Sequence, residues 1–137
     1  MWIFQYILCV FFFVYLPISV KASERVETHR QCQANTKTKL SDDIVHKLHT
    51  GEEVNDPILG KHMLCMFTKM LIMNADGDIN AEVLRTKANR ALKDENKLNA
   101  LVKRCSSIKE PGSAEDAAIK LLKCVEIDVP VIKHQYT

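Results

Sequence analysis

The sequence predicts an all-α domain, a compact bundle of about six helices closed by two disulfides. Three observations predict this class. Apolar residues recur at the spacing of one helix face through most of the chain. Residues that start or stop helices separate these segments at short intervals. Four cysteines remain once an N-terminal leader is set aside, and no segment shows the alternation that is typical of a strand.

The first 22 residues have the features of a cleaved secretory signal peptide. Residues 2–20 are almost unbroken apolar sequence, and Val20–Lys21–Ala22 has the small residues that signal peptidase requires. Residues 23–137 then form the mature domain, and these 115 residues suffice for one modest core. The alternative is an uncleaved signal anchor, since about 18 apolar residues can span a bilayer.

The mature chain is nearly neutral and poor in aromatic residues. Without Lys21, 18 basic residues face 17 acidic ones, and this balance gives no reason to expect nucleic acid as a partner. Seven Lys and Arg residues gather between Arg85 and Arg104. We interpret them as a solvated helical face, with contact to an anionic membrane surface as the alternative. Only Phe67 and Tyr136 remain as aromatic residues, so aliphatic side chains and methionine must build the core.

The mature cysteines are Cys32, Cys65, Cys105 and Cys124, because Cys9 leaves with the leader. An even number of cysteines in a small secreted chain indicates a disulfide framework. Four cysteines allow three pairings, and their spacing alone does not choose among them. A metal site is not predicted, because the sequence has no Cys-x-x-Cys motif and no close cluster of cysteine and histidine.

Start signals define the predicted helices. Ser41, Asn80, Asp94 and Ser113 are suited to N-cap positions, and Asp56 precedes a proline at the first helical position. The predicted helices span Glu24 to about Thr36, Asp42 to His49, Pro57 to about Met73, Ala81 to about Leu92, Asp94 to the Pro111–Gly112 stop, and Ser113 to about Val125.

The segment from Pro57 to about Met73 is apolar on nearly all sides and is therefore predicted to lie at the centre of the fold. Four of its residues are methionines, whose flexible side chains suit surfaces that accept varied apolar shapes. They can fill a core or form the wall of a cavity, and the residues alone leave both possibilities open.

No motif in the sequence predicts catalysis or a cofactor. The segment from Asn74 to Asp78 resembles part of a calcium-binding EF-hand loop. The first and last ligand positions of such a loop, however, hold Ile72 and Val83, which cannot bind calcium. We therefore predict a turn between two helices, and a protein that is not an enzyme.

The cysteine spacing resembles that of the insect odorant-binding family (pheromone-binding and general odorant-binding proteins, PBP/GOBP). Thirty-nine residues separate Cys65 from Cys105, and eighteen separate Cys105 from Cys124. That family has six cysteines, and its second and fifth would fall at Lys61 and Glu115. These two form one bridge in the family, so the sequence resembles its four-cysteine, "minus-C" branch.

The resemblance implies a bundle of about six helices around a buried apolar cavity, with disulfides Cys32–Cys65 and Cys105–Cys124. It also suggests an ion pair between Lys61 and Glu115 at the two vacated positions. The tail Val129–Ile132 is expected to fold over the cavity. The residues expected to line the cavity are Leu59, Met63, Met66, Phe67, Met70, Met73, Leu84, Ala88, Leu101, Ala118, Leu121, Leu122 and Val125.

The resemblance implies a secreted, extracellular carrier of small hydrophobic ligands such as odorants, pheromones or related semiochemicals. With Phe67 as the one expected aromatic residue in the wall, aliphatic or terpenoid ligands should be favoured. A membrane receptor or an anionic membrane surface is a further expected partner, and the expected state is a monomer or weak homodimer. The alternative is a secreted four-cysteine signalling or venom-type protein that acts through protein–protein contact and has a filled core.

Overall fold

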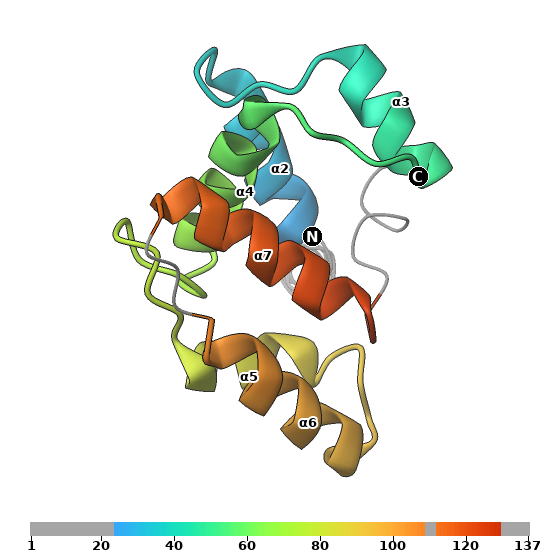
Figure 1. Cartoon of the computed structure of the whole chain (residues 1–137), viewed down its shortest axis with the longest axis vertical. Coiled ribbons are helices and arrows are strands. Elements are labelled where there is room, and N and C mark those ends of the chain that lie inside the picture. The colour runs from blue at the N-terminus through green and yellow to red at the C-terminus, as the bar shows by residue number, and fades with distance from the viewer. Residues whose placement is uncertain (1–23, 109–111, 130–137) are drawn as a thin grey trace, which may run out of the picture.

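The computed structural model describes residues 24–108 and 112–129, and these form six helices with no strand (Figure 1). Met73 and Ile79 make one isolated antiparallel bridge. The predicted leader and residues 130–132 of the expected lid lie outside the described residues. The helices are α2 (Glu24–Ala34), α3 (Asp42–Thr50), α4 (Pro57–Lys69), α5 (Ala81–Ala88), α6 (Glu95–Ser106) and α7 (Ala114–Glu126).

Helix α4 is central, as its apolar sequence predicts. It packs against α2 and against α7, and α7 in turn packs against α6, which pairs with α5. Figure 1 shows α3 at one end of the long axis and the α5–α6 pair at the other. One buried apolar cluster has members from α3 to α7. None of its buried members comes from α2, which contributes only Thr28 and Cys32 as buried residues.

Side-chain caps begin five of the helices, and all five predicted N-caps are confirmed. Ser41, Asp56, Asn80, Asp94 and Ser113 each accept a hydrogen bond from a backbone N–H in the first turn of the helix that follows. At the start of α7 the side chain of Asp116, the third helical residue, also accepts a hydrogen bond from the backbone N–H of the cap residue. Short polar side chains therefore fix where these helices begin.

Helix α4 ends at Lys69, so the prediction that it continues to about Met73 is wrong. The backbone N–H of Ile72 donates to the Phe67 carbonyl (3.0 Å), and that of Leu71 donates to Thr68 (3.1 Å). These two bonds form the Schellman pattern that closes a helix, with Leu71 in the left-handed conformation (φ 61°). The apolar pattern of the sequence continues past the end of the helix because Met73, which follows the turn, is also buried.

Replacing Leu71 with glycine is expected to raise the free energy of unfolding by about 1 kcal/mol. The left-handed conformation costs a residue with a Cβ about 1–2 kcal/mol, and glycine avoids this cost. The greater freedom of glycine in the unfolded chain offsets part of the resulting gain in stability. The side chain of Leu71 is 71% exposed, so its removal sacrifices little burial. Denaturant titration followed by far-UV circular dichroism measures the change. Leu71→Ala is the control and should show no gain; a less stable glycine variant would contradict the expectation.

Three other helices also end before their predicted limits. Helix α6 ends at Ser106 and does not continue to the predicted stop at Pro111–Gly112. Helix α5 stops at Ala88 instead of about Leu92, because the chain continues in tight turns in which Ala91 N–H donates to the Ala88 carbonyl. Helix α2 stops at Ala34. There the Thr38 hydroxyl donates to the Cys32 carbonyl at 2.7 Å and so satisfies one of the last free carbonyls of the helix.

Gly60 lets α4 and α7 approach closely. A Cβ at this position would lie 3.2 Å from both the Cβ and the carbonyl oxygen of Glu115. The suggested ion pair between Glu115 and Lys61 is not formed: Lys61 is exposed, and no ion pair within the described residues includes either side chain. Contact through the glycine, not a charged pair, therefore joins the two helices beside the vacated bridge positions.

Candidate functional site

Two disulfides cross-link neighbouring helices. Cys32–Cys65 joins α2 to α4, and Cys105–Cys124 joins α6 to α7. This is the pairing that the resemblance implies. The first bridge secures α2, which adds nothing to the buried apolar cluster, and the second fixes α6 beside α7.

Most of the expected cavity-lining residues gather in the buried apolar cluster of the bundle. Ten of them are buried members of it: Leu59, Met63, Phe67, Met73, Leu84, Ala88, Leu101, Ala118, Leu121 and Leu122. Met70 and Val125 are partly buried and pack against the cluster. Met66 is fully buried but is not a member. The fold therefore brings these side chains together around α4.

A pocket of about 460 Å³, which we call the α3–α7 pocket, opens at the surface of this cluster. The end of α3, the loop after it, the start of α4 and the face of α7 form its walls. Its apolar lining consists of Leu48, Val54, Leu59, Ile119 and Leu122. Leu59 and Leu122 are the two expected site residues that line it.

Charged residues also line the α3–α7 pocket, and most of them are exposed to solvent at its mouth. Glu52 and Glu53 come from the loop after α3, and Lys123 and Glu126 come from α7. The lining thus includes three carboxylates and one ammonium group. Glu126 is half-buried, and burial raises the pKa of its carboxyl. Glu52 accepts a hydrogen bond from the Thr50 hydroxyl at 3.0 Å.

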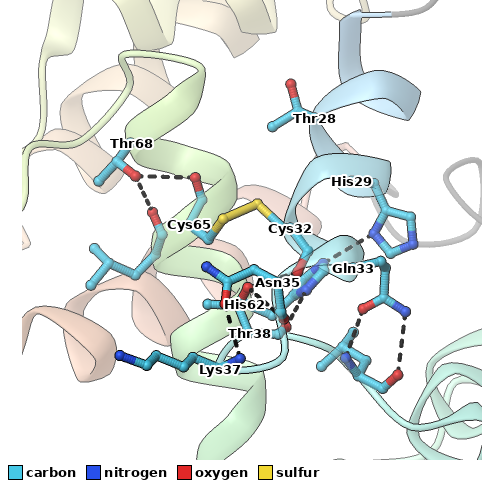
Figure 2. Close-up of a disulfide and its surroundings, with 12 residues drawn as sticks. Thr28, His29, Cys32, Gln33, Asn35, Lys37, Thr38, His62, Cys65 and Thr68 are labelled. Carbon is cyan, nitrogen blue, oxygen red and sulfur yellow. Dashed lines mark hydrogen bonds between the residues drawn. A yellow bond between two sulfur atoms is a disulfide. The ribbon is translucent and has the colours of Figure 1, made fainter.

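A second feature is a pair of histidines beside the Cys32–Cys65 disulfide (Figure 2). His62 is fully buried on α4, and its Nδ1 lies 2.8 Å from the Thr38 carbonyl oxygen. Because a carbonyl only accepts, this Nδ1 carries the proton, and Nε2 of His62 accepts from His29 Nδ1 at 3.0 Å. The chain of hydrogen bonds joins α2, the loop after it and α4.

Both histidines of this pair are held neutral. Burial, and to a smaller extent the neighbouring His62, lowers the pKa of His29 to about 4. Burial also lowers the pKa of His62, against the opposing effect of its hydrogen bond to Thr38. An additional proton on this pair would place a positive charge in a contact that is largely shielded from water, and burial disfavours that charge.

Stability is therefore expected to fall as the pH is lowered from 7.5 to 4.5. In the unfolded chain these histidines bind protons below about pH 6.5, whereas in the folded chain burial lowers the pKa of His29 to about 4 and also lowers the pKa of His62. Their contribution is complete above pH 6.5 and is lost as the pH falls toward 4. After allowance for screening by solvent, we expect a loss of about 1–2 kcal/mol.

Denaturant titrations at several pH values measure this loss. The variant His29→Asn/His62→Asn should be less stable at pH 7.5 but should lose less than half as much between pH 7.5 and 4.5. Equal pH dependence in both proteins would show that carboxylates, and not this pair, cause the acid sensitivity.

The described residues contain neither a metal-binding cluster nor a membrane-spanning helix. No group of three or more His, Cys, Asp or Glu side chains among them could hold a metal ion. Within the same ranges, no helix has the length and apolar character needed to cross a membrane. The segment from Asn74 to Asp78 is the predicted turn: the Asn74 side-chain oxygen accepts from the backbone N–H groups of Asp76 (3.0 Å) and Asp78 (2.9 Å).

Neither the charged residues that line the pocket nor the contact between His29 and His62 was predicted from the sequence. Glu52 and Glu53 lie in a loop whose path depends on tertiary packing, so no local pattern marks them. The histidine pair did leave a signal. His29 precedes Cys32 by three residues and His62 precedes Cys65 by three, so a bridge between the cysteines brings both histidines to the same contact.

These features define a class: a small helical domain, cross-linked by two disulfides, with an apolar pocket at the edge of its core. The sequence model of the PBP/GOBP family matches residues 20–127. The chain belongs to this family, as the cysteine spacing indicated. Its placement in a four-cysteine branch stays a prediction.

Relatives and solved structures agree with this assignment. The chain is 30% identical to the B1 protein of Tenebrio molitor over 119 residues, which cover 84% of this chain and 90% of that protein. The B2 protein of the same beetle is 29% identical, with 84% and 91% covered. The fold is that of the Locusta migratoria odorant-binding protein lmigOBP1 (TM-score 0.62, 16% identity, 82% and 83% covered). It is also that of dmelOBP28a from Drosophila melanogaster (TM-score 0.62, 17% identity, 79% and 91% covered).

Proposed function

We propose that this protein is a secreted carrier that binds small hydrophobic molecules in extracellular fluid and catalyses no reaction. The observation that carries the proposal is the α3–α7 pocket, whose apolar lining is continuous with the core through Leu59 and Leu122. Its volume of about 460 Å³ falls in the range of roughly 300–1,000 Å³ that is common for small-molecule sites. Family membership supports the same function.

The methionines of α4 extend this site inward. Leu59 and Leu122 belong to the same buried cluster as Met63, Phe67 and Met73. Methionine side chains rearrange at low cost. A ligand that enters between Leu59 and Leu122 can therefore displace the side chains of Met63 and Met73 and occupy space deeper in the bundle. Phe67 is the single aromatic residue of the buried cluster, which favours aliphatic and terpenoid ligands over ligands that need ring stacking.

Binding of a fluorescent probe tests the carrier function. N-phenyl-1-naphthylamine should bind the mature protein at a 1:1 ratio and should be displaced by aliphatic alcohols. Leu122→Glu places a charge in the apolar lining and should weaken probe binding more than tenfold. Because this change can also unfold the core, Val54→Glu, at a half-buried loop position of the same pocket, is the second variant.

Ile127→Glu is the matched control, since Ile127 is 72% exposed just beyond α7 and does not line the pocket. It should bind the probe like the wild type. If the wild type binds no probe, or binds it without saturation or competition, the carrier function is wrong. The protein-contact alternative, in which the core is filled, then becomes the better explanation.

A further inference from the structure

We propose that the ligand of the α3–α7 pocket is a cationic amphiphile, a small molecule with an aliphatic body and a protonated amine at one end. This inference rests on the carrier function proposed above and specifies the chemistry of its ligand. It follows from the contrast between the apolar lining of the pocket and the charges around its mouth.

The apolar lining accounts for the body of the ligand. Leu48, Leu59 and Leu122 are buried, and Val54 and Ile119 are half-buried. These aliphatic side chains come from three helices and one loop, and they offer no hydrogen-bonding side chain. A flexible hydrocarbon chain therefore fits this surface better than a polar ligand, which would lose its hydration without replacement.

The charges at the mouth account for the head group. Glu52, Glu53 and Glu126 line the pocket together with Lys123, so the rim has a net charge of about −2 when all four groups are ionised. Lys123 makes no ion pair within the described ranges. An ammonium head is attracted by this rim, whereas a carboxylate head is repelled.

Glu126 is the carboxylate best placed to bind the head group directly. It is half-buried, and it accepts no hydrogen bond from any described residue. Burial without such a bond raises the pKa of its carboxyl. A charged donor at the pocket mouth would supply the missing partner. Such charge-assisted hydrogen bonds are roughly twice as strong as neutral ones.

A metal ion does not explain these carboxylates. No three of the described His, Cys, Asp and Glu side chains are close enough to ligate one ion. Carboxylates beside an apolar pocket suit an alkylammonium ion. Its ammonium group can stay at the mouth while its alkyl chain enters the pocket.

Three twelve-carbon compounds that differ only in the head group test this inference: dodecylamine, 1-dodecanol and dodecanoic acid. Each competes with N-phenyl-1-naphthylamine for the mature protein at pH 7.5, at concentrations below micelle formation. The amine should bind about tenfold more tightly than the alcohol, and the acid more weakly than the alcohol. The preference for the amine should shrink in high salt.

Glu126→Gln should remove most of the amine preference and leave the affinity for the alcohol unchanged, and Glu53→Gln should have the same effect to a smaller degree. Glu82→Gln on α5, which makes the same change of charge away from this pocket, is the control and should keep the full preference. Equal affinities for amine and alcohol, tighter binding of the acid, or an amine preference that survives in Glu126→Gln/Glu53→Gln would overturn the inference while leaving the carrier function intact. Failure of all three compounds to displace the probe would count against the carrier function itself.

Discussion

Replacing Cys32 and Cys65 together with alanine is expected to lower the free energy of unfolding by about 4 kcal/mol. The bridge closes a loop of 33 residues, and in the chain-entropy model a loop of this length contributes about 4 kcal/mol. Helix α2 depends on this bridge more than the other helices do, because none of its side chains is a buried member of the apolar cluster. Backbone amides of α2 should therefore exchange with solvent faster than those of α6 in this variant.

The second disulfide provides the matched control. Cys105→Ala/Cys124→Ala opens a loop of 19 residues and is expected to cost about 3 kcal/mol. Since α6 and α7 also pack through buried Leu98, Leu101 and Leu121, α2 should keep its protection in this variant. If both pairs of substitutions expose the same helices to exchange, the disulfides do not stabilise separate parts of the fold.

Leu121→Ala is expected to lower the free energy of unfolding by about 3 kcal/mol, within the range of 2–5 kcal/mol for such truncations in cores. Leu121 is completely buried on α7, the helix that packs against both α4 and α6. The loss combines the lost transfer free energy of the side chain with the cost of the cavity that remains.

Urea titration followed at 222 nm measures this loss, since the one tryptophan of the chain, Trp2, lies in the predicted leader. The midpoint should fall while the slope stays constant, because the area exposed on unfolding barely changes. Ile127→Ala, at an exposed position beyond the same helix, should alter stability by less than about 0.5 kcal/mol. A similarly small effect of Leu121→Ala would mean that the surrounding helices close the space.

Helix starts could be predicted from the sequence because their cause is local. A short polar side chain at Ser41 or Asn80 bonds to the backbone three residues later, so the cap and its effect lie within one turn. Helix ends were predicted less well. The turn at Leu71 is closed by backbone bonds back to Phe67 and Thr68, and it places a residue with a Cβ where glycine is usual.

Two of the five apolar residues that line the pocket could be assigned to inward faces in the same way, and the charged residues could not. Helical periodicity assigned Leu59 and Leu122 to inward faces. Glu53 and Glu126 line the same pocket only because the loop after α3 lies beside α7. That arrangement depends on tertiary packing between segments more than sixty residues apart, which no local pattern encodes.

The two disulfides close consecutive loops, residues 32–65 and 105–124, that do not interlock. Neither loop crosses the boundary where Gly60 meets Glu115. The peptide chain from 66 to 104 therefore connects the two disulfide-closed loops. No disulfide joins α4 to α7, and the two helices contact each other through packing. Separation of α4 from α7 at this contact therefore breaks no sulfur–sulfur bond.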